Sequence, residues 1–188
     1  MLEPERSSGS SGRRSVISVF GSGTVTNADA AYELARNLGA ALSKKNYAVA
    51  TGGYGGLMEA VSQGAAENGG HVIGVTASAI SNKTNPWVHQ QITVDSWEQR
   101  LHRLIAIGDG YVACPGGTGT LAELAVVWEM LNKGLVSDRP LVILGDFWNP
   151  VVEHVEFSEK RARGMVRRAE TVAAAVDILS KTIAFRIS

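Results

Sequence analysis

Three glycine-rich segments of this chain carry residue types that bind phosphate groups. They are FGSGT (residues 20–24), TGGYGG (51–56) and PGGTGT (115–120), and each follows an apolar run and precedes a segment of helical period. Glycine permits close approach and positive-φ turns, so successive backbone N–H groups can face one cluster of oxygen atoms. The partial positive charge at the start of the next helix also favours an anion. We therefore predict an anion site, with the hydroxyls of Thr118 and Thr120 as further donors.

The spacing of these glycines differs from that of two common nucleotide-binding motifs. A single glycine-rich turn is weak support for a ligand, because a sharp turn needs glycine in any case. Three such turns in one chain are harder to explain without a ligand. None ends in the Lys-Ser/Thr pair of a Walker A loop, and none has the full G-x-G-x-x-G spacing after the first strand with an acidic residue closing the second. An ATPase and a typical dinucleotide dehydrogenase are both disfavoured.

The elements that must position these segments alternate along the chain. Short runs rich in valine and isoleucine alternate with longer segments of helical period, which is typical of parallel strands joined by helices. We predict strands at 15–21, 47–51, 71–76, 91–95, 110–114 and 140–145, and helices at 27–46, 57–68, 96–107, 119–133 and 169–183. This is a Rossmann-like α/β fold, a doubly wound parallel sheet flanked by helices. All three glycine-rich segments would lie at its carboxyl edge, where a crevice forms at the reversal of strand order.

Composition limits the domain count and the partners. The chain has 188 residues, which suits a single domain, and we place that domain at 15–188. Residues 1–14, MLEPERSSGSSGRR, are rich in serine, glycine and charge, so we predict a disordered N-terminal tail. The 18 lysines and arginines balance 18 aspartates and glutamates, so no net field attracts a nucleic acid polymer or an anionic membrane. We expect a small-molecule ligand.

Neither a membrane span nor a metal site is predicted. The sequence has no run of about 18 apolar residues and no signal-peptide core, which predicts a cytoplasmic protein. Its one cysteine, Cys114, has no histidine at an interpretable spacing and is expected in the core. The histidines at 71, 89, 102 and 154 are scattered, so we expect no metal and no redox cofactor.

Two motifs and one spacing resemble the Lonely Guy (LOG) family. PGGTGTLAE (115–123) matches its PGGxGTxxE motif, and GGYGGLMEA (52–60) is similar to its GGxxGLM segment. DSWEQRL (95–101) puts Arg100 at the offset from Pro115 at which the family has its catalytic arginine. The resemblance covers about residues 15 to 150 and implies a Rossmann-like, usually dimeric phosphoribohydrolase that releases a base from a nucleoside 5′-monophosphate. The best-known substrates are cytokinin-type adenylates with an isoprenoid group on the exocyclic nitrogen.

The resemblance assigns roles to individual residues. Glu123 and Arg100 become the catalytic pair: breaking an N-glycosidic bond creates positive charge on the ribose, which a carboxylate stabilises. Arginine stays protonated and can hold that carboxylate or contact phosphate and ribose hydroxyls. The expected substrate- and phosphate-binding residues are Gly21, Ser22, Gly53, Gly56, Met58, Pro115, Gly116, Gly117, Thr118, Gly119 and Thr120.

Departures from the family pattern leave two classes of function open. Leu101 stands where the family has lysine, Trp97 and Gln99 replace its methionine and glutamate, and Thr51 replaces the first glycine of its GGG. One class is the phosphoribohydrolase. The other is a nucleotide or cofactor carrier, such as the related molybdenum-cofactor carrier proteins, which bind without catalysis and have no chemical reason to keep the pair.

Simpler structural roles also remain open for single residues. Thr120 and Glu123 fit the S/T-x-x-E capping box, in which the glutamate only satisfies a backbone N–H. Arg100 alone would ordinarily be a solvated helix residue.

The helix predicted at 119–133 is apolar around most of its circumference, which favours a homodimer through this helix. The alternative is that the C-terminal segment of the same chain covers it.

Overall fold

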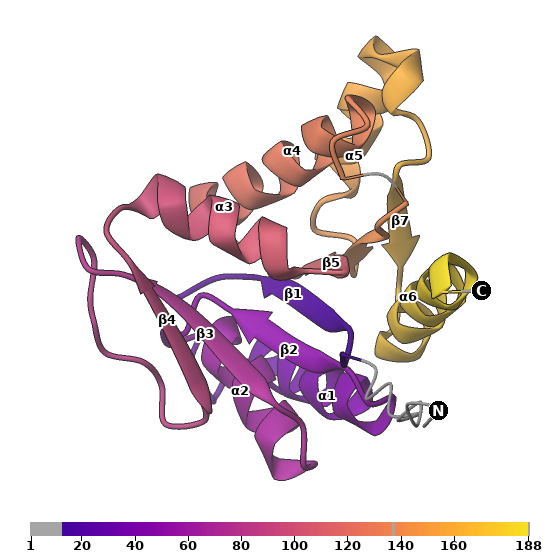
Figure 1. Cartoon of the computed structure of the whole chain (residues 1–188). Helices are drawn as coiled ribbons and strands as arrows, with labels where there is room; N and C mark the ends of the chain where they lie inside the picture. Colours follow the sequence, from indigo (N-terminus) through magenta and orange to yellow (C-terminus); the bar gives the residue numbers. More distant parts are fainter. Residues whose placement is uncertain (1–12, 137, 188) are drawn as a thin grey trace, which may run out of the picture.

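The computed structural model describes residues 13–136 and 138–187, and within them the chain forms a parallel sheet with helices on both faces (Figure 1). The strands are β1 (Val16–Phe20), β2 (Ala48–Thr51), β3 (Val72–Ala77), β4 (Gln90–Val94), β5 (Gly110–Ala113), β6 (Leu141–Leu144) and β7 (Val166–Ala169). The helices are α1 (Ala30–Lys44), α2 (Leu57–Glu67), α3 (Trp97–Ile107), α4 (Thr118–Asn132), α5 (Asn149–Ser158) and α6 (Val172–Ile187), with a short 3-10 turn, η1 (Lys160–Ala162), after α5. No helix in the described ranges is long and apolar enough to cross a lipid bilayer. The predicted Rossmann-like α/β class is confirmed.

The strand order is β4-β3-β2-β1-β5-β6-β7, and neighbouring strands are parallel throughout. The chain builds outward from β1 to β4 and then returns to place β5 on the other side of β1. The reversal of strand order therefore lies between β1 and β5. Because the strands are parallel, the segments after β1, β2 and β5 emerge at the same edge. The glycine-rich segments thus share the carboxyl edge of the sheet, as predicted.

The two faces of the sheet bury two separate hydrophobic clusters. Successive residues of β1 point to opposite faces, so Ile17 and Val19 belong to one cluster while Val16 and Phe20 belong to the other. The first cluster includes buried residues of α1, α2 and α6, and the second includes those of α3, α4 and α5 (Figure 1). The helices α3 and α4 therefore cover the same face of the sheet.

The segment after β6 departs most from the sequence prediction. The predicted helix at 169–183 is wrong at its start, because Ala169 is the last residue of β7 and α6 begins at Val172. Neither β7 nor α5 was predicted. With four residues and two exposed arginines, β7 lacks the apolar run of the inner strands. Pro150 in the first turn of α5 is a helix-start signal that the sequence does contain.

Most of the predicted N-terminal tail, residues 1–12, lies outside the described residues. The guanidinium of Arg13 donates to both carboxylate oxygens of Asp109, each 2.9 Å from Nη2. Asp109 also accepts a hydrogen bond of 2.9 Å from the backbone N–H of Val16. These contacts tie the entry to β1 to the turn before β5.

Candidate active site

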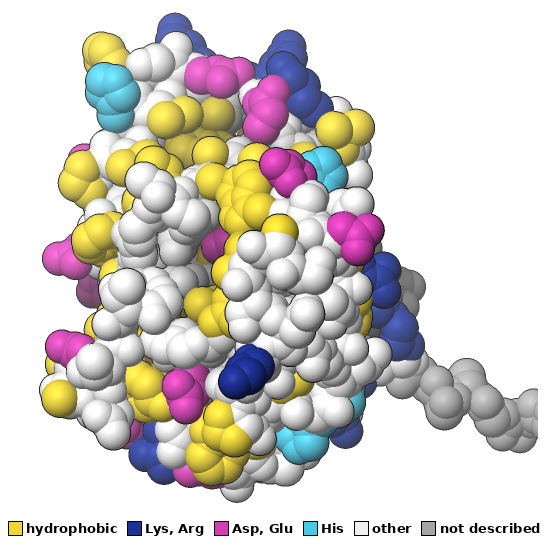
Figure 2. All heavy atoms as spheres, turned by 90° about the vertical axis from the view of Figure 1, so that its left-hand side faces the viewer, with side chains coloured by type: hydrophobic (Ala, Val, Ile, Leu, Met, Phe, Trp, Pro, Cys, Tyr) yellow, Lys and Arg dark blue, Asp and Glu magenta, His cyan; other side chains and the backbone are white. Residues whose placement is uncertain are grey.

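A cleft of about 380 Å³ opens at the carboxyl edge of the sheet. Figure 2 views the molecule from this edge and shows a hollow in the middle of the view, bordered mainly by white and yellow atoms. The segments after β1 and β2, the start of α4 and one side of α3 form the cleft. Its lining includes nine residues predicted from the sequence: Gly21, Ser22, Met58, Arg100, Gly117, Thr118, Gly119, Thr120 and Glu123.

Five further residues that line the cleft were not predicted, namely Gly23, Thr24, Tyr54, Ile80 and Trp97. Gly23, Thr24 and Tyr54 lie inside the glycine-rich segments, so the sequence did contain a signal for placing them in the site. Trp97 precedes Arg100 by one helical turn, which puts both on the same side of α3. Ile80 comes from the connection between β3 and β4, where the sequence offers no signal for it.

Gly53 and Gly56 were predicted to contact substrate, but they do not line the cleft and instead shape the turn after β2. Both have positive φ, 75° and 69°, which favours glycine. A Cβ on Gly53 would lie 3.3 Å from the Cα of Gly74, and one on Gly56 would overlap the carbonyl of Ser22. The two glycines let this turn pack closely against β3 and the segment after β1.

Pro115 and Gly116 also lie behind the surface of the cleft. The Pro115 carbonyl accepts a hydrogen bond of 3.1 Å from the backbone N–H of Ser22. A Cβ on Gly116 would overlap Oγ1 of Thr120 and would lie 3.1 Å from the Ser22 nitrogen. These residues join the glycine-rich segments after β1 and β5 to each other.

The first turn of α4 is open toward the cleft. Its N-cap, Gly117, has no side chain that could accept hydrogen bonds from the N–H groups of that turn. A Cβ on Gly117 or Gly119 would meet nothing within 4 Å, and both residues are exposed, as is Thr118. The first N–H groups of an α-helix have no partner inside the helix and carry partial positive charge. This turn can therefore accept an anion.

The capping-box alternative for Glu123 is wrong. The helix begins at Thr118, so Thr120 is its third residue and Glu123 lies in the second turn. A capping box needs the hydroxyl at the N-cap and the glutamate three residues later. Glu123 therefore does not cap the start of α4.

Arg100 and Glu123 meet as a buried ion pair between α3 and α4. The distance from Arg100 Nη1 to Glu123 Oε1 is 3.6 Å, which is longer than a hydrogen bond, and the side chains are only 7% and 10% exposed. The alternative prediction, that Arg100 is an ordinary solvated residue of its helix, is therefore wrong. The structure brings together the two residues that the sequence analysis assigned to catalysis.

Burial changes how readily the Glu123 carboxyl group ionises. It raises the pKa of Glu123 to about 7, although the positive charge of Arg100 acts in the opposite direction. Near neutral pH the carboxyl group can therefore hold or release a proton, which suits general acid and base catalysis.

Further contacts hold the Arg100 guanidinium. Its Nε donates to the Val75 carbonyl at 2.9 Å, and its Nη2 lies 3.6 Å from the sulfur of Met58. The Arg100 Cζ lies over the ring of Tyr54, 5.3 Å from the ring centroid. A Cβ on Gly52 would overlap Nη2, so this glycine leaves room for the guanidinium.

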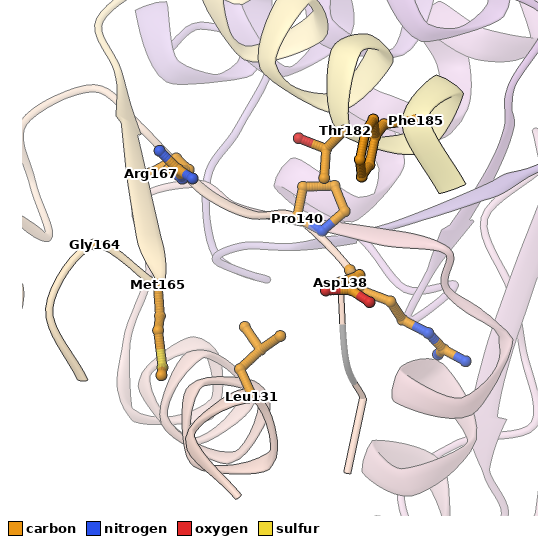
Figure 3. A pocket seen from close by; sticks show the side chains of 9 residues that line it. Leu131, Asp138, Pro140, Gly164, Met165, Arg167, Thr182 and Phe185 are labelled. Atoms are coloured by element: carbon orange, nitrogen blue, oxygen red, sulfur yellow. The ribbon is translucent and has the colours of Figure 1, made fainter. Parts of the chain in front are cut away.

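A larger hollow, of about 680 Å³, lies at the opposite edge of the sheet (Figure 3). It lies between the amino ends of β6 and β7 and the carboxyl ends of α4 and α6, with Leu131, Met165 and Phe185 among its apolar residues. None of the predicted site residues lines it. The glycine-rich segments and the ion pair belong to the smaller cleft, which we take as the site.

Cys114 precedes the glycine-rich segment after β5 but does not line the cleft. It is buried, and burial raises the pKa of its thiol to about 12. This agrees with the predicted role as a core residue, because the thiolate is the nucleophilic form.

The fold and the cleft define a class of Rossmann-like protein with a crevice, bordered by glycine-rich segments, at the reversal of strand order. Within that class, residues 14–176 match the model of the SLOG cluster4 family, and this chain belongs to that family. The resemblance to the LOG family found in the motifs is confirmed.

Curated relatives include enzymes named cytokinin riboside 5′-monophosphate phosphoribohydrolase. The one from Rhodococcoides fascians is 29% identical over an alignment of 130 residues, and this alignment covers 66% of this chain and 65% of that protein. One from Arabidopsis thaliana is 29% identical over an alignment of 164 residues, and this alignment covers 76% of this chain and 69% of that protein. The match thus spans just under two thirds of the bacterial relative.

Solved structures with the same fold include proteins that handle the molybdenum cofactor. A molybdenum cofactor binding protein from Rippkaea orientalis has a TM-score of 0.76 and 25% identity, over 91% of this chain and 98% of that chain. The molybdenum cofactor carrier protein of Chlamydomonas reinhardtii also has a TM-score of 0.76, at 23% identity over 92% and 99% of the chains. The second likeness shows the fold alone.

The raised pKa of Glu123 predicts how stability changes with pH. A carboxyl group whose pKa rises on folding contributes stability below its unfolded pKa, here 4.5, and that contribution is lost as pH rises through about 7. Glu123→Gln cannot ionise. We expect the free energy of unfolding of the wild type to fall by about 2 kcal/mol relative to this variant between pH 5 and pH 8.

Urea denaturation at both pH values measures this difference. Glu153→Gln, which removes an exposed carboxylate from α5, is the matched control. Its free energy of unfolding should change with pH in the same way as that of the wild type. Parallel stability curves for the wild type and Glu123→Gln would contradict the assignment.

Proposed function

We propose that this protein is a phosphoribohydrolase. It cleaves the N-glycosidic bond of a purine nucleoside 5′-monophosphate of the cytokinin type and releases the free base and ribose 5-phosphate. The observation that carries the proposal is the buried pair of Arg100 and Glu123, 3.6 Å apart, in a cleft bordered by glycine-rich segments. The names of the curated relatives support the choice of substrate class.

The two sides of the cleft differ in chemistry, which orients such a substrate. The start of α4 offers backbone N–H groups and threonine hydroxyls, and the segment after β1 adds Ser22 and Thr24. We assign the phosphate to these donors. Ile80 and Trp97 are 54% and 38% exposed and give the other side an apolar surface, to which we assign the base.

With the phosphate held, the sugar is aligned with Glu123. Hydrolysis breaks the bond between the anomeric carbon and the base, the oxygen of water bonds to that carbon, and the base leaves with the electron pair and takes up a proton. Glu123 accepts the proton of the attacking water or stabilises the positive charge on the ribose. Arg100 holds the carboxylate and can contact phosphate or ribose oxygens.

A carrier function is the second candidate. The likeness to the molybdenum cofactor binding protein of Rippkaea orientalis, at 25% identity, favours it. A carrier needs the anion-binding turn of α4 but has no chemical need for a buried carboxylate with a pKa of about 7. We therefore prefer the hydrolase.

Base release from AMP and from isoprenoid-substituted AMP, followed by chromatography, tests the proposal. We expect release by the wild type and a loss of at least about 100-fold in Glu123→Ala, because a positioned proton-transfer group contributes that much. Release that is absent, or equal in the variant, would exclude the enzyme.

Calorimetry of nucleotide binding separates the two candidates. Gly119→Asp adds a negative charge where a Cβ has open space, so it should weaken nucleotide binding without disturbing the fold, and Gly119→Ala is its control. Glu123→Ala should leave affinity largely intact. A wild type that binds nucleotide tightly and releases no base would favour the carrier.

We also propose a homodimer through α4. The outer face of this helix exposes Leu121, by 37%, and Ala125. Part of its remaining apolar surface is covered within the chain: Trp128 is buried, and its Nε1 donates to the Ala162 carbonyl at 3.2 Å. Around Trp128, therefore, a later segment of the same chain covers α4, as in the alternative to the dimer.

Sedimentation equilibrium tests the dimer. We expect the wild type to be dimeric and Leu121→Asp to shift it toward the monomer. Phe157→Asp, on the exposed face of α5, is the control for adding charge to an apolar surface position. A monomeric wild type would contradict this part of the proposal.

A further inference from the structure

Arg100 has fewer strong contacts than a buried guanidinium can use. Among the five N–H donors of its fork, Nε has a short hydrogen bond, to the Val75 carbonyl at 2.9 Å. Nη2 faces the sulfur of Met58 at 3.6 Å, and a thioether is a weak acceptor. The distance to Glu123, 3.6 Å, exceeds a hydrogen bond. The outer end of the guanidinium therefore depends on another contact for its position.

The ring of Tyr54 supplies that contact. The Arg100 Cζ lies 5.3 Å from the ring centroid, within the range of a cation–π interaction. Such a contact is strengthened where water is excluded, and the Arg100 side chain is only 7% exposed. An aromatic face restrains the guanidinium plane without using the N–H donors, which stay available to Glu123 and to a substrate.

Tyr54 is itself fixed at both ends. Its hydroxyl accepts a hydrogen bond from the Ala77 N–H at 3.0 Å and donates to the Ser81 carbonyl at 3.1 Å. Its own carbonyl accepts from Asn85 Nδ2 at 2.9 Å. The ring is thus tied to the end of β3 and to the connection that follows, which also carries the cleft residue Ile80.

The turn that carries Tyr54 is built to bring the ring and the guanidinium together. Gly53 has a φ of 75°, which lets the chain turn immediately before the tyrosine. Gly52 has no Cβ, and one would overlap Arg100 Nη2. Together these features place an anchored ring beside the outer end of the Arg100 guanidinium.

We propose that Tyr54 is a positioning residue, whose ring holds the Arg100 guanidinium beside Glu123. Its role in catalysis rests on the proposed hydrolase function, although its effect on the ion pair does not. Among the residues that the structure describes, the ionisable side chains that line the cleft are Glu123, Arg100 from α3 and Tyr54 from the turn after β2. A change in the titration of Glu123 therefore reports on this contact.

The test compares the pH dependence of base release in three variants with that of the wild type. Tyr54→Leu removes the ring, Tyr54→Phe keeps it without the hydroxyl, and Tyr47→Leu removes a half-buried tyrosine outside the cleft. In Tyr54→Leu we expect kcat at pH 7 to fall about tenfold. Arg100 lowers the pKa of Glu123, so a displaced guanidinium should also move the acidic limb of the profile to higher pH.

Tyr54→Phe keeps the ring but loses both hydrogen bonds of the hydroxyl, so its midpoint should lie between those of the wild type and Tyr54→Leu. Tyr47→Leu should not move the midpoint. A uniform loss of rate in Tyr54→Leu with an unchanged midpoint would mean a merely structural role and would overturn the proposal. An unchanged rate, or a Phe variant as impaired as the Leu variant, would overturn it as well.

A second measurement separates this inference from the proposed function. If the wild type releases no base, the hydrolase proposal fails. The Glu123 carboxyl carbon can still be titrated by NMR in the same proteins. A midpoint at higher pH in Tyr54→Leu than in Tyr54→Phe would then support the positioning role, and equal midpoints would refute it.

Discussion

The ion pair between Arg100 and Glu123 is the interaction on which the site depends, because it takes two charges almost wholly out of water. Removing an ion from water costs several kcal/mol, and the attraction between partners offsets this only with good geometry. Here the partners are 3.6 Å apart, and the raised pKa of Glu123 shows that burial outweighs the attraction of Arg100. The free protein thus holds an under-stabilised carboxylate. We infer that positive charge developing on a bound sugar would stabilise it, which is what catalysis of glycosidic cleavage requires.

The sheet makes this arrangement possible. The return of the chain from β4 to β5 creates a crevice beside β1, and α3 and α4 approach it on the same face of the sheet. The glycine-rich segments serve two purposes there. Gly117 and Gly119 leave the start of α4 open to a ligand, whereas Gly53, Gly56 and Gly116 let backbone segments pack closely against one another. A close fit among these turns holds the cleft in shape.

Sequence patterns predicted the inner strands, the crevice and both members of the ion pair. They succeeded because buried parallel strands read as apolar runs and because Arg100 and Glu123 lie within recognisable motifs. They could not separate the glycines that face a ligand from those that permit close packing, since both kinds occupy the same segments. The role of Tyr54 depends on contacts with the connection after β3, and Ile80 reaches the cleft from that connection. Neither leaves a periodic signal in the sequence.

The most direct test of the account is a crystal structure of the Glu123→Gln variant with a bound nucleoside 5′-monophosphate. We predict that phosphate oxygens lie about 3 Å from the backbone nitrogens of the first turn of α4, with the anomeric carbon beside residue 123 and the base toward Trp97. A phosphate bound at the hollow near Arg139 and Arg167, or a sugar turned away from residue 123, would contradict the account.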